Sequence, residues 1–269
     1  MKQTGLTLVE LLVTVAIVTL FMATLLPCLQ NSRSQAKAVL CSSNVKQLVI
    51  GLIIYEAENA NFPYALDSTP EEPPVGGYAG NLAYDRTGWW WFNYISDYSR
   101  PEYSGKGEGR KSVLWCPCRK IRNRKLEAHV LHGNYGVNQS ICKSSCGRKS
   151  HAEFIGTPLR GTDISNPSQT LLLVDSGYSM ITWWHVTDSP PISLSSIIED
   201  TAYIPGLCIN KDRLLWPGEE WDAINGRHPN RTLNVGFVDG HVSRTNADDL
   251  LVERAGDSYK NLSPLWLPK

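Results

Sequence analysis

Residues 5–29 are GLTLVELLVTVAIVTLFMATLLPCL, and this stretch decides how the whole chain is organised. Residues 6–29 contain a single charged side chain, Glu10. A helix of this length spans about 36 Å, which is enough to cross a hydrocarbon core about 30 Å thick. A secretory signal peptide has a shorter apolar run that ends in an Ala-x-Ala-like cleavage site. No such site precedes the charged stretch that starts at Arg33. The sequence therefore predicts that residues 6–29 are a retained membrane anchor.

The charges that flank this segment bear on its orientation. Lys2 lies on the N-terminal side, and the positive-inside rule therefore favours a cytoplasmic N-terminus. Arg33 and Lys37 follow on the other side and reduce the asymmetry. We expect a single-pass membrane protein whose remaining residues lie outside the cytoplasm.

The membrane segment continues into an amphipathic helix over residues 30–58. Apolar residues recur there at spacings of three and four, which places one apolar stripe on an otherwise polar helix. Pro27 removes a backbone donor and crowds the carbonyl of Ala23, so we expect it to kink the rod. The stripe must pack on something, most simply the face of a sheet built from the rest of the chain. Its members are Ala38, Cys41, Val45, Leu48, Leu52 and Tyr55.

Residues 59–269 have a different character, with proline- and glycine-rich loops and short runs that suit β-strands. Asp239-Gly240 suits a two-residue hairpin turn between the last two runs. We therefore predict an α+β fold, in which the long N-terminal helix packs on a C-terminal antiparallel β-sheet with long loops. The expected strands are Val113–Trp115, Thr170–Val174, Ile181–Val186, Thr232–Val238 and His241–Arg244.

The composition excludes several classes of function. Lys and Arg number 26, as do Asp and Glu, so no overall field attracts nucleic acid. Nine Trp and eleven Tyr are too much apolar mass to leave solvated, which argues against disorder. The chain lacks Gly-x-Ser-x-Gly, His-Glu-x-x-His and a dinucleotide fingerprint, so we expect neither an enzyme nor a cofactor.

Gly5-Leu6-Thr7-Leu8-Val9-Glu10, followed at once by an uninterrupted apolar helix, closely resembles the N-terminus of type IV pilins and type II secretion pseudopilins. The resemblance implies that residues 1–5 are a leader, removed by a prepilin peptidase between Gly5 and Leu6, and that the new Leu6 amine is methylated. It also implies that Glu10 meets the amine of a neighbouring subunit and so selects a staggered packing. Pro27 falls where pilin helices commonly bend. The implied location is the bacterial inner membrane, with residues 59–269 in the periplasm or on a filament.

The resemblance extends along the rest of the chain. Members of a large pilin-like family have, near the C-terminus, a His that is followed after nine residues by Asp-Gly. Here ten residues separate His228 from Asp239-Gly240, because the intervening turn contains one additional residue. Further landmarks are Cys41–Leu48, Phe62-Pro63, Trp115–Pro117, Asn134–Asn138 and Leu172–Ser176.

Seven cysteines leave two kinds of site open. Cys116, Cys118, Cys142 and Cys146 could hold a structural zinc, although a spacing of one residue suits tetrahedral ligation poorly. Disulfides are the favoured alternative outside the cytoplasm. The family positions imply a bridge between Cys41 and Cys116, and Cys28 is the candidate for an unpaired thiol.

Other residues could bind ligands or simply support the fold. His228, Asp239 and His241 could form a metal or acid–base cluster, or could only make the turn. Asp175, Asp239 and Asp188 could offer oxygens to calcium, without the regular spacing of a calcium loop. Trp89–Trp91 and Trp183-Trp184 could stack on sugars, although alternate residues of a strand face the core, so half of each cluster is expected to be packing.

Two functions of different class follow. The first is a structural subunit that polymerises through its N-terminal helix with other pilin-like subunits, in a secretion pseudopilus or a pilus-like filament. The second is a membrane-tethered binding module, for example for glycans, that uses the pilin N-terminus for export and anchoring. A DNA-uptake pilin is a third and weaker alternative and would use the basic run Arg119-Lys120, Arg122, Arg124 and Lys125, although such a run is more often a solvated loop.

Overall fold

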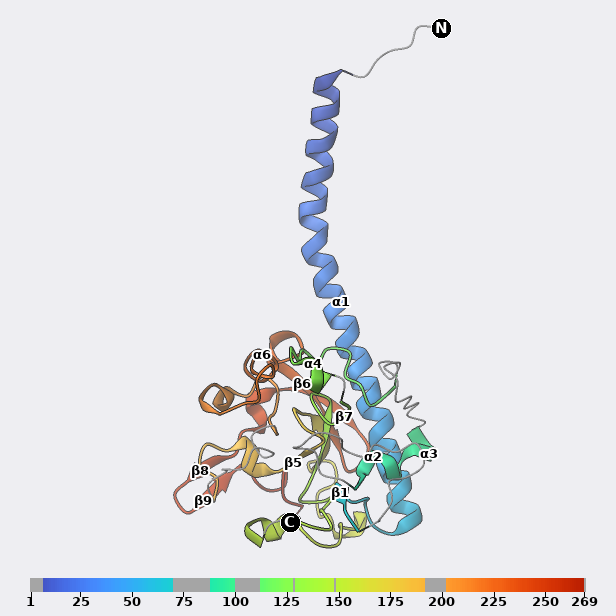
Figure 1. The fold of residues 1–269 in the computed structure, drawn as a ribbon, viewed down its shortest axis with the longest axis vertical. Helices are drawn as coiled ribbons and strands as arrows, with labels where there is room; N and C mark the ends of the chain where they lie inside the picture. The colour runs from blue at the N-terminus through green and yellow to red at the C-terminus, as the bar shows by residue number, and fades with distance from the viewer. Residues whose placement is uncertain are drawn as a thin grey trace.

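The computed structural model describes residues 7–69, 88–99, 112–127, 129–147, 149–191 and 202–268. It has the predicted α+β architecture: a long N-terminal helix extends out of a head that contains the β-sheets (Figure 1). The N-terminal half of the helix projects away from the head, and its C-terminal half runs along it. The C-terminus lies at the end of the head remote from the N-terminus (Figure 1).

Helix α1 covers Leu8–Asn59, close to the predicted extent. Thr7 is its N-cap, and the helix ends at Ala60, whose φ of 62° is left-handed. Pro27 lies inside α1, and the helix continues through it, so the rod is continuous as predicted; the kink at Pro27 stays a prediction. A proline removes one backbone hydrogen bond, and the ladders on either side hold the two halves in one helix.

The main sheet has five strands in the order β5-β3-β4-β6-β7. Its neighbours are antiparallel, as predicted, except that β5 runs parallel to β3. All five residues of β4 are buried, so both faces of the sheet centre are covered. The strands are β3 (Tyr135–Asn138), β4 (Leu171–Asp175), β5 (Met180–Ile181), β6 (Thr232–Phe237) and β7 (Val242–Asn246).

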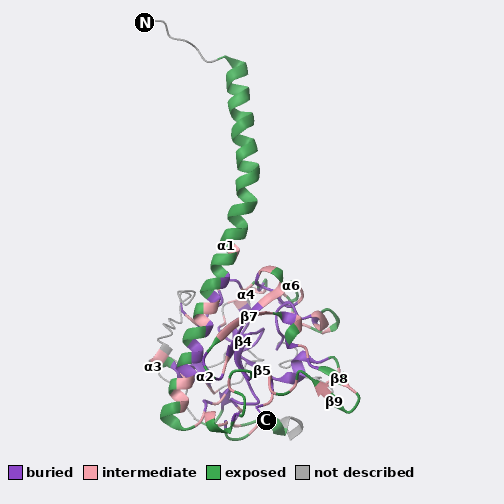
Figure 2. Ribbon diagram, turned by 180° about the vertical axis from the view of Figure 1, so that it is seen from behind, coloured by how far each residue is buried: buried purple, intermediate pink, exposed green. Residues whose placement is uncertain are grey.

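The C-terminal half of α1 packs on this sheet through the predicted stripe, against β4, β6 and β7. Figure 2 shows buried residues along the part of α1 that meets the head and exposed ones along the projecting part. A Cβ atom at Gly236 of β6 would lie 2.3 Å from a methyl of Val49, so the helix and sheet approach closely where the strand has no side chain. Tyr55 is only partly buried, and the fully buried members of the stripe are Ala38, Cys41, Val45, Leu48 and Leu52.

Shorter elements complete the head. Two small antiparallel sheets pair β1 (Leu66–Asp67) with β2 (Trp89–Trp90) and β8 (Glu253–Ala255) with β9 (Ser258–Lys260). The short α-helices are α2 (Trp91–Tyr94), α3 (Ser96–Ser99), α4 (Arg124–Glu127) and α6 (Glu220–Asn225). The 3₁₀ helices are η2 (Lys149–Phe154), η3 (Gly161–Asp163), η4 (Trp183–Val186), η5 (Cys208–Asp212), η6 (Pro229–Arg231) and η7 (Ala247–Leu250).

Two expected strands are wrong in whole or in part. Residues 113–115 form a turn, in which the Trp115 amide donates to the Ser112 carbonyl over 3.1 Å. Residues 181–186 contribute only the end of β5 before the chain enters η4. There the Thr182 amide donates to His185 Nδ1 over 3.1 Å, and this local bond to a side chain replaces the strand pairing.

The β6–β7 hairpin is present, but its turn is longer than the two residues expected. The Gly240 amide donates to the Phe237 carbonyl and the Phe237 amide to the His241 carbonyl, each over 3.0 Å. Gly240 has a φ of 91°, as in hairpins that follow a type I turn with a left-handed residue. Asp239-Gly240 therefore lies in the turn as predicted, with one more residue enclosed.

Candidate functional site

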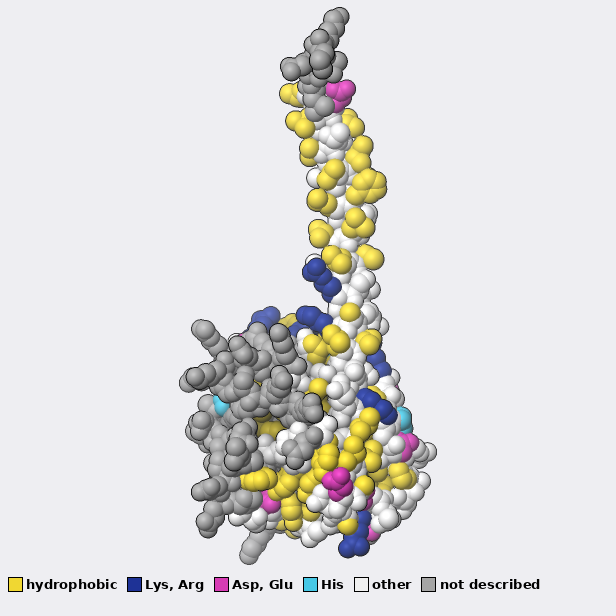
Figure 3. All heavy atoms as spheres, turned by 90° about the vertical axis from the view of Figure 1, so that its right-hand side faces the viewer, with side chains coloured by type: hydrophobic (Ala, Val, Ile, Leu, Met, Phe, Trp, Pro, Cys, Tyr) yellow, Lys and Arg dark blue, Asp and Glu magenta, His cyan; other side chains and the backbone are white. Residues whose placement is uncertain are grey.

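The projecting half of α1 is the first candidate site. Its large apolar side chains from Leu8 to Leu29 are between 47% and 79% exposed. This part of α1 is long and apolar enough to cross a membrane, and the described residues of the head bury none of its most apolar stretch. In Figure 3 hydrophobic side chains cover the visible face of the projecting helix. Such a surface is stable only in lipid or against other apolar helices.

Thr7 and Glu10 close the free end of this helix as a capping box. The Thr7 amide and its hydroxyl each donate to Glu10 Oε2 over 2.8 Å, and the Glu10 amide donates back to Thr7 Oγ1 over 3.3 Å. This pairing was not among the features predicted from the sequence, although the Thr-x-x-Glu spacing is its ordinary signature. Glu10 therefore has a local structural partner in addition to any partner on another subunit. Gly5 and Leu6, between which cleavage is expected, lie outside the described residues.

A second candidate site lies between α1 and the sheet, where four buried side chains that could ligate a metal meet. The Sγ atoms of Cys41 and Cys116 are 3.4 Å apart. The Cys41 thiol donates to Asp175 Oδ1 over 3.2 Å, and His228 Nε2 lies 3.1 Å from Asp175 Oδ2. Their four ligand atoms all lie within 4.8 Å of one another. Within the described ranges, no other group of three or more His, Cys, Asp and Glu residues meets this criterion.

Neighbouring strands hold the carboxylate and its surroundings in place. Tyr135 on β3 is the register partner of Asp175 on β4, and its hydroxyl lies 3.4 Å from the Cys41 sulfur. The backbone amide of Asn234 on β6 donates to Asp175 Oδ2 over 2.7 Å. We call Cys41, Cys116, Asp175 and His228 the thiol–carboxylate cluster.

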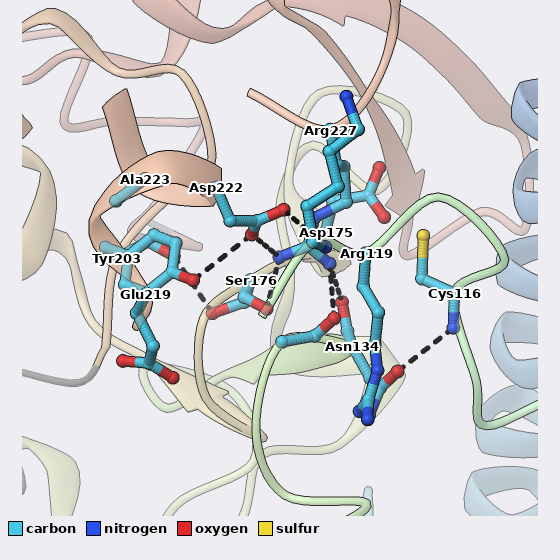
Figure 4. Close-up of polar contacts among 12 residues, drawn as sticks. Cys116, Arg119, Asn134, Asp175, Ser176, Tyr203, Glu219, Asp222, Ala223 and Arg227 are labelled. Carbon is cyan, nitrogen blue, oxygen red and sulfur yellow. Dashed lines mark hydrogen bonds and ion pairs between the residues drawn. The ribbon is translucent and has the colours of Figure 1, made fainter. Parts of the chain in front are cut away.

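A buried hydrogen-bond network fixes the segment that carries Cys116 (Figure 4). The Cys116 amide donates to Asn134 Oδ1 over 3.0 Å. Arg227 donates to the Asn134 carbonyl over 2.9 Å and to the Ser176 carbonyl over 3.1 Å. The same guanidinium forms a fully buried ion pair with Asp222, at 2.6 Å. Arg227 thus connects the loop before β3 and the end of β4 to α6.

The charges in the cluster shift its titration. Burial alone would lower the pKa of His228, but the Asp175 carboxylate and the contact with Cys116 outweigh it and raise this pKa to about 9. Burial would likewise raise the pKa of Cys116, but hydrogen bonds from Cys118, Cys41 and His228, with the charge of Arg227, lower it well below the usual thiol value. Burial, Cys116 and Asp175 raise the pKa of Cys41. Cys116 is therefore the more readily ionised thiol of the pair.

The predicted cysteine partners are only partly brought together. Cys41 and Cys116 meet as expected, but their sulfurs are in contact and not bonded, so the bridge stays a prediction. Cys118 contacts Cys116, whereas Cys142 is buried elsewhere in the core and Cys146 is exposed. In the part of the chain that the structure describes, the alternative four-thiol zinc site is not formed, because Cys142 and Cys146 do not lie in a common group with Cys116 and Cys118.

The expected cluster around the hairpin is also divided. His228 is buried against Asp175, whereas Asp239 Oδ1 accepts from His241 Nδ1 over 2.6 Å on the exposed hairpin. Asp188 is exposed as well. Over the described ranges, Asp175, Asp239 and Asp188 therefore do not form the calcium site considered from the sequence. The hairpin pair matches the alternative in which these residues make the turn.

The tryptophan clusters are more deeply buried than alternation along a strand predicts. Trp90 and Trp91 are at most 1% exposed, and Trp183 and Trp184 are each 4% exposed. The second pair lies on η4 and not on a strand, so both rings point into the core. Trp89 is only partly buried. The four buried rings offer no surface on which a sugar could stack.

Part of the basic run packs on the protein itself. The guanidinium of Arg119 lies 4.2 Å from the centre of the Trp115 ring, and the ammonium of Lys120 lies 4.0 Å from that of Trp221. Arg122 is exposed, and the side chains of Arg124 and Lys125 lie outside the described residues.

The described chain is thus an exposed apolar helix, capped near an acidic residue at its tip, that projects from an α+β head. Residues 1–26 match the family model of the prokaryotic N-terminal methylation motif. This match supports a type IV pilin-like precursor and is consistent with a pseudopilin. It covers the N-terminal segment alone, and no curated protein and no solved structure matches the chain.

Proposed function

We propose that this protein is a structural subunit of a type II secretion pseudopilus or a type IV pilus-like filament, without catalytic activity of its own. The observation that carries the proposal is the exposed helix: among the described residues, the large apolar side chains of Leu8–Leu29 are exposed, while α1 from Ala38 onward packs on the sheet. The methylation motif lies at the tip of the same helix. Before assembly, the helix of such a subunit would be inserted in the inner membrane. On assembly, it would leave the membrane and pack in a bundle of identical or related helices.

Processing at the tip creates the charge that organises the bundle. Prepilin peptidase would remove residues 1–5, with cleavage between Gly5 and Leu6, and a methylated amine would remain on Leu6. A carboxylate in an apolar surrounding costs about 2.5–3.5 kcal/mol unless it is paired. Glu10 of one subunit would therefore pair with the Leu6 amine of the next, which fixes the stagger between them. The N-terminus would be cytoplasmic before cleavage, and residues 59–269 would be periplasmic or on the filament surface.

The test must separate the charge of Glu10 from its role as a helix cap. Glu10→Gln removes the charge but keeps the capping box, because Gln also serves at this position. Thr7→Ala removes the hydroxyl that the Glu10 amide bonds to and leaves the charge in place. Both variants and the wild type would be crosslinked in membranes that contain an active prepilin peptidase, and intact mass would confirm that each is processed.

We expect ladders of crosslinked oligomers from the wild type and from Thr7→Ala, and mainly monomer from Glu10→Gln. A full ladder from Glu10→Gln would contradict the pairing of Glu10 with a neighbour. Loss of the ladder in Thr7→Ala alone would assign Glu10 to helix capping. If the processed wild type gives monomer only, the subunit proposal fails, and a membrane-tethered binding module replaces it.

A further inference from the structure

The thiol–carboxylate cluster brings four ionisable side chains together in the core of the head. Cys41 is 0% and Cys116 is 3% exposed, and the side chains of Asp175 and His228 are completely buried. Buried groups of this kind are retained where they pair with each other or bind a metal ion. The four come from α1, from the turn after Ser112, from β4 and from the segment before η6, so their meeting is a product of tertiary structure.

The distances within the cluster resemble the edges of a small tetrahedron. With ordinary zinc–ligand bonds, those edges would be about 3.8 Å between two sulfurs, about 3.6 Å between sulfur and oxygen, and about 3.4 Å between nitrogen and oxygen. Here the Cys41 and Cys116 sulfurs are 3.4 Å apart, the Cys41 sulfur is 3.2 Å from Asp175 Oδ1, and His228 Nε2 is 3.1 Å from the other carboxylate oxygen, Oδ2. All four ligand atoms lie within 4.8 Å of one another. These three contacts would have to lengthen by a few tenths of an ångström, with one oxygen of Asp175 facing the ion, to admit it.

We propose that Cys41, Cys116, Asp175 and His228 together hold one tetrahedrally coordinated divalent metal ion, with zinc as the ion that suits their donors best. Two sulfurs, one imidazole nitrogen and one carboxylate oxygen are ligands that zinc accepts in proteins. Four protein ligands leave no open position, so the site is structural. Both thiols bind as thiolates and His228 binds as a neutral imidazole, and the protons that these groups lose pass to solvent.

Two of the four proposed ligands, Asp175 and Cys116, are held by hydrogen bonds of the kind that orient metal ligands. Metal ligands are usually oriented by hydrogen bonds from residues that do not touch the ion. Here the Asn234 amide donates to Asp175 Oδ2 over 2.7 Å, and Asn134 accepts from the Cys116 amide over 3.0 Å. Arg227, whose charge acts on both Cys116 and Asp175, offsets part of the negative charge of two thiolates and a carboxylate.

A disulfide between Cys41 and Cys116 is the competing use of the same two sulfurs. It would remove the thiol hydrogen that Cys41 donates to Asp175 Oδ1 and would leave that oxygen against a sulfur that cannot donate. Metal binding gives the same oxygen a positive partner. The two alternatives are mutually exclusive, and one measurement can distinguish them.

The test uses the full-length chain, extracted in detergent without chelators and purified through an affinity tag that contains no histidine. Metal content per chain would be measured by mass spectrometry, and cobalt would replace the native ion for absorption spectroscopy. Cobalt in a tetrahedral site with two thiolates gives intense visible bands and a sulfur-to-metal charge-transfer band. Cys116→Ser would remove one ligand, and Cys142→Ser is the matched control, because Cys142 is equally buried but lies outside the cluster.

We expect about one zinc per chain in the wild type and in Cys142→Ser, and at least a tenfold lower content in Cys116→Ser. The wild-type cobalt spectrum keeps the proposal testable even if Cys116→Ser does not fold. Two results would overturn it: folded, reduced wild type that takes up no cobalt with thiolate bands, or non-reducing peptide maps that show Cys41 joined to Cys116. Neither result depends on whether the subunit assembles.

Discussion

Replacing Leu48 by Ala tests whether the packing of the C-terminal half of α1 on the sheet stabilises the head. Leu48 is fully buried between the helix and the sheet, whereas Leu40, eight residues earlier on the same helix, is 58% exposed. The two substitutions delete the same atoms from the same helix, so Leu40→Ala is a matched control. We expect a large loss of stability from the first and almost none from the second.

The magnitude follows from the atoms removed. Three buried carbons at about 0.8 kcal/mol each are worth about 2.4 kcal/mol of transfer free energy. Partial collapse around the vacated space leaves a cavity that costs roughly 1 kcal/mol more. Leu48→Ala should therefore lower the free energy of unfolding by about 3–4 kcal/mol. Leu40→Ala should stay within about 0.5 kcal/mol of the wild type.

The assay is denaturation of the full-length chain as a monomer in detergent, followed by the fluorescence of its nine tryptophans. A head of this size loses about 2–4 °C of melting temperature per kcal/mol, so Leu48→Ala should melt roughly 6–16 °C lower. A loss below about 1 kcal/mol for Leu48→Ala, or equal losses for both variants, would refute the view that α1 is an integral part of the head.

Gly236→Ala should lower the free energy of unfolding by about 1–3 kcal/mol, because the new Cβ would lie 2.3 Å from a Val49 methyl. Adding Val49→Ala should recover part of this loss. Chemical denaturation of the single and double variants checks both expectations, and additive losses would contradict the contact. Asp222→Asn should cost about 3–5 kcal/mol, because it leaves Arg227 charged and buried without its partner. Asp248→Asn breaks a half-exposed ion pair and should cost under about 1 kcal/mol; equal losses would show that burial is not the cause. The mature chain should begin at Leu6 with a methylated amine, and intact-mass analysis that finds residues 1–5 still attached in the presence of prepilin peptidase would contradict the processing model.

Patterns that are local along the chain could be predicted correctly. The membrane segment follows from hydropathy over residues 6–29, and the buried side of α1 follows from the 3–4 spacing that begins at Ala38, because a helix places such residues on one face whatever surrounds it. The β6–β7 hairpin also has a local signal, in the alternation of Thr232–Phe237 and the dipeptide after it. Short apolar runs carry less information: Trp183-Trp184 was expected on a strand, and the neighbouring Thr182 and His185 instead form a 3₁₀ turn.

The sequence by itself determined the helix, its membrane half and its packing stripe, because each depends on the order of residues within a few turns. Tertiary structure alone decided which side chains meet beneath that stripe. Cys41 lies 75 residues from Cys116 and 134 from Asp175, and His228 lies a further 53 residues along the chain. Strand register places Tyr135 beside Asp175 and thus near Cys41, and Gly236 lets the helix approach closely enough for the thiol to reach the carboxylate. No spacing in the chain encodes those distances, since they arise only when helix and sheet pack together.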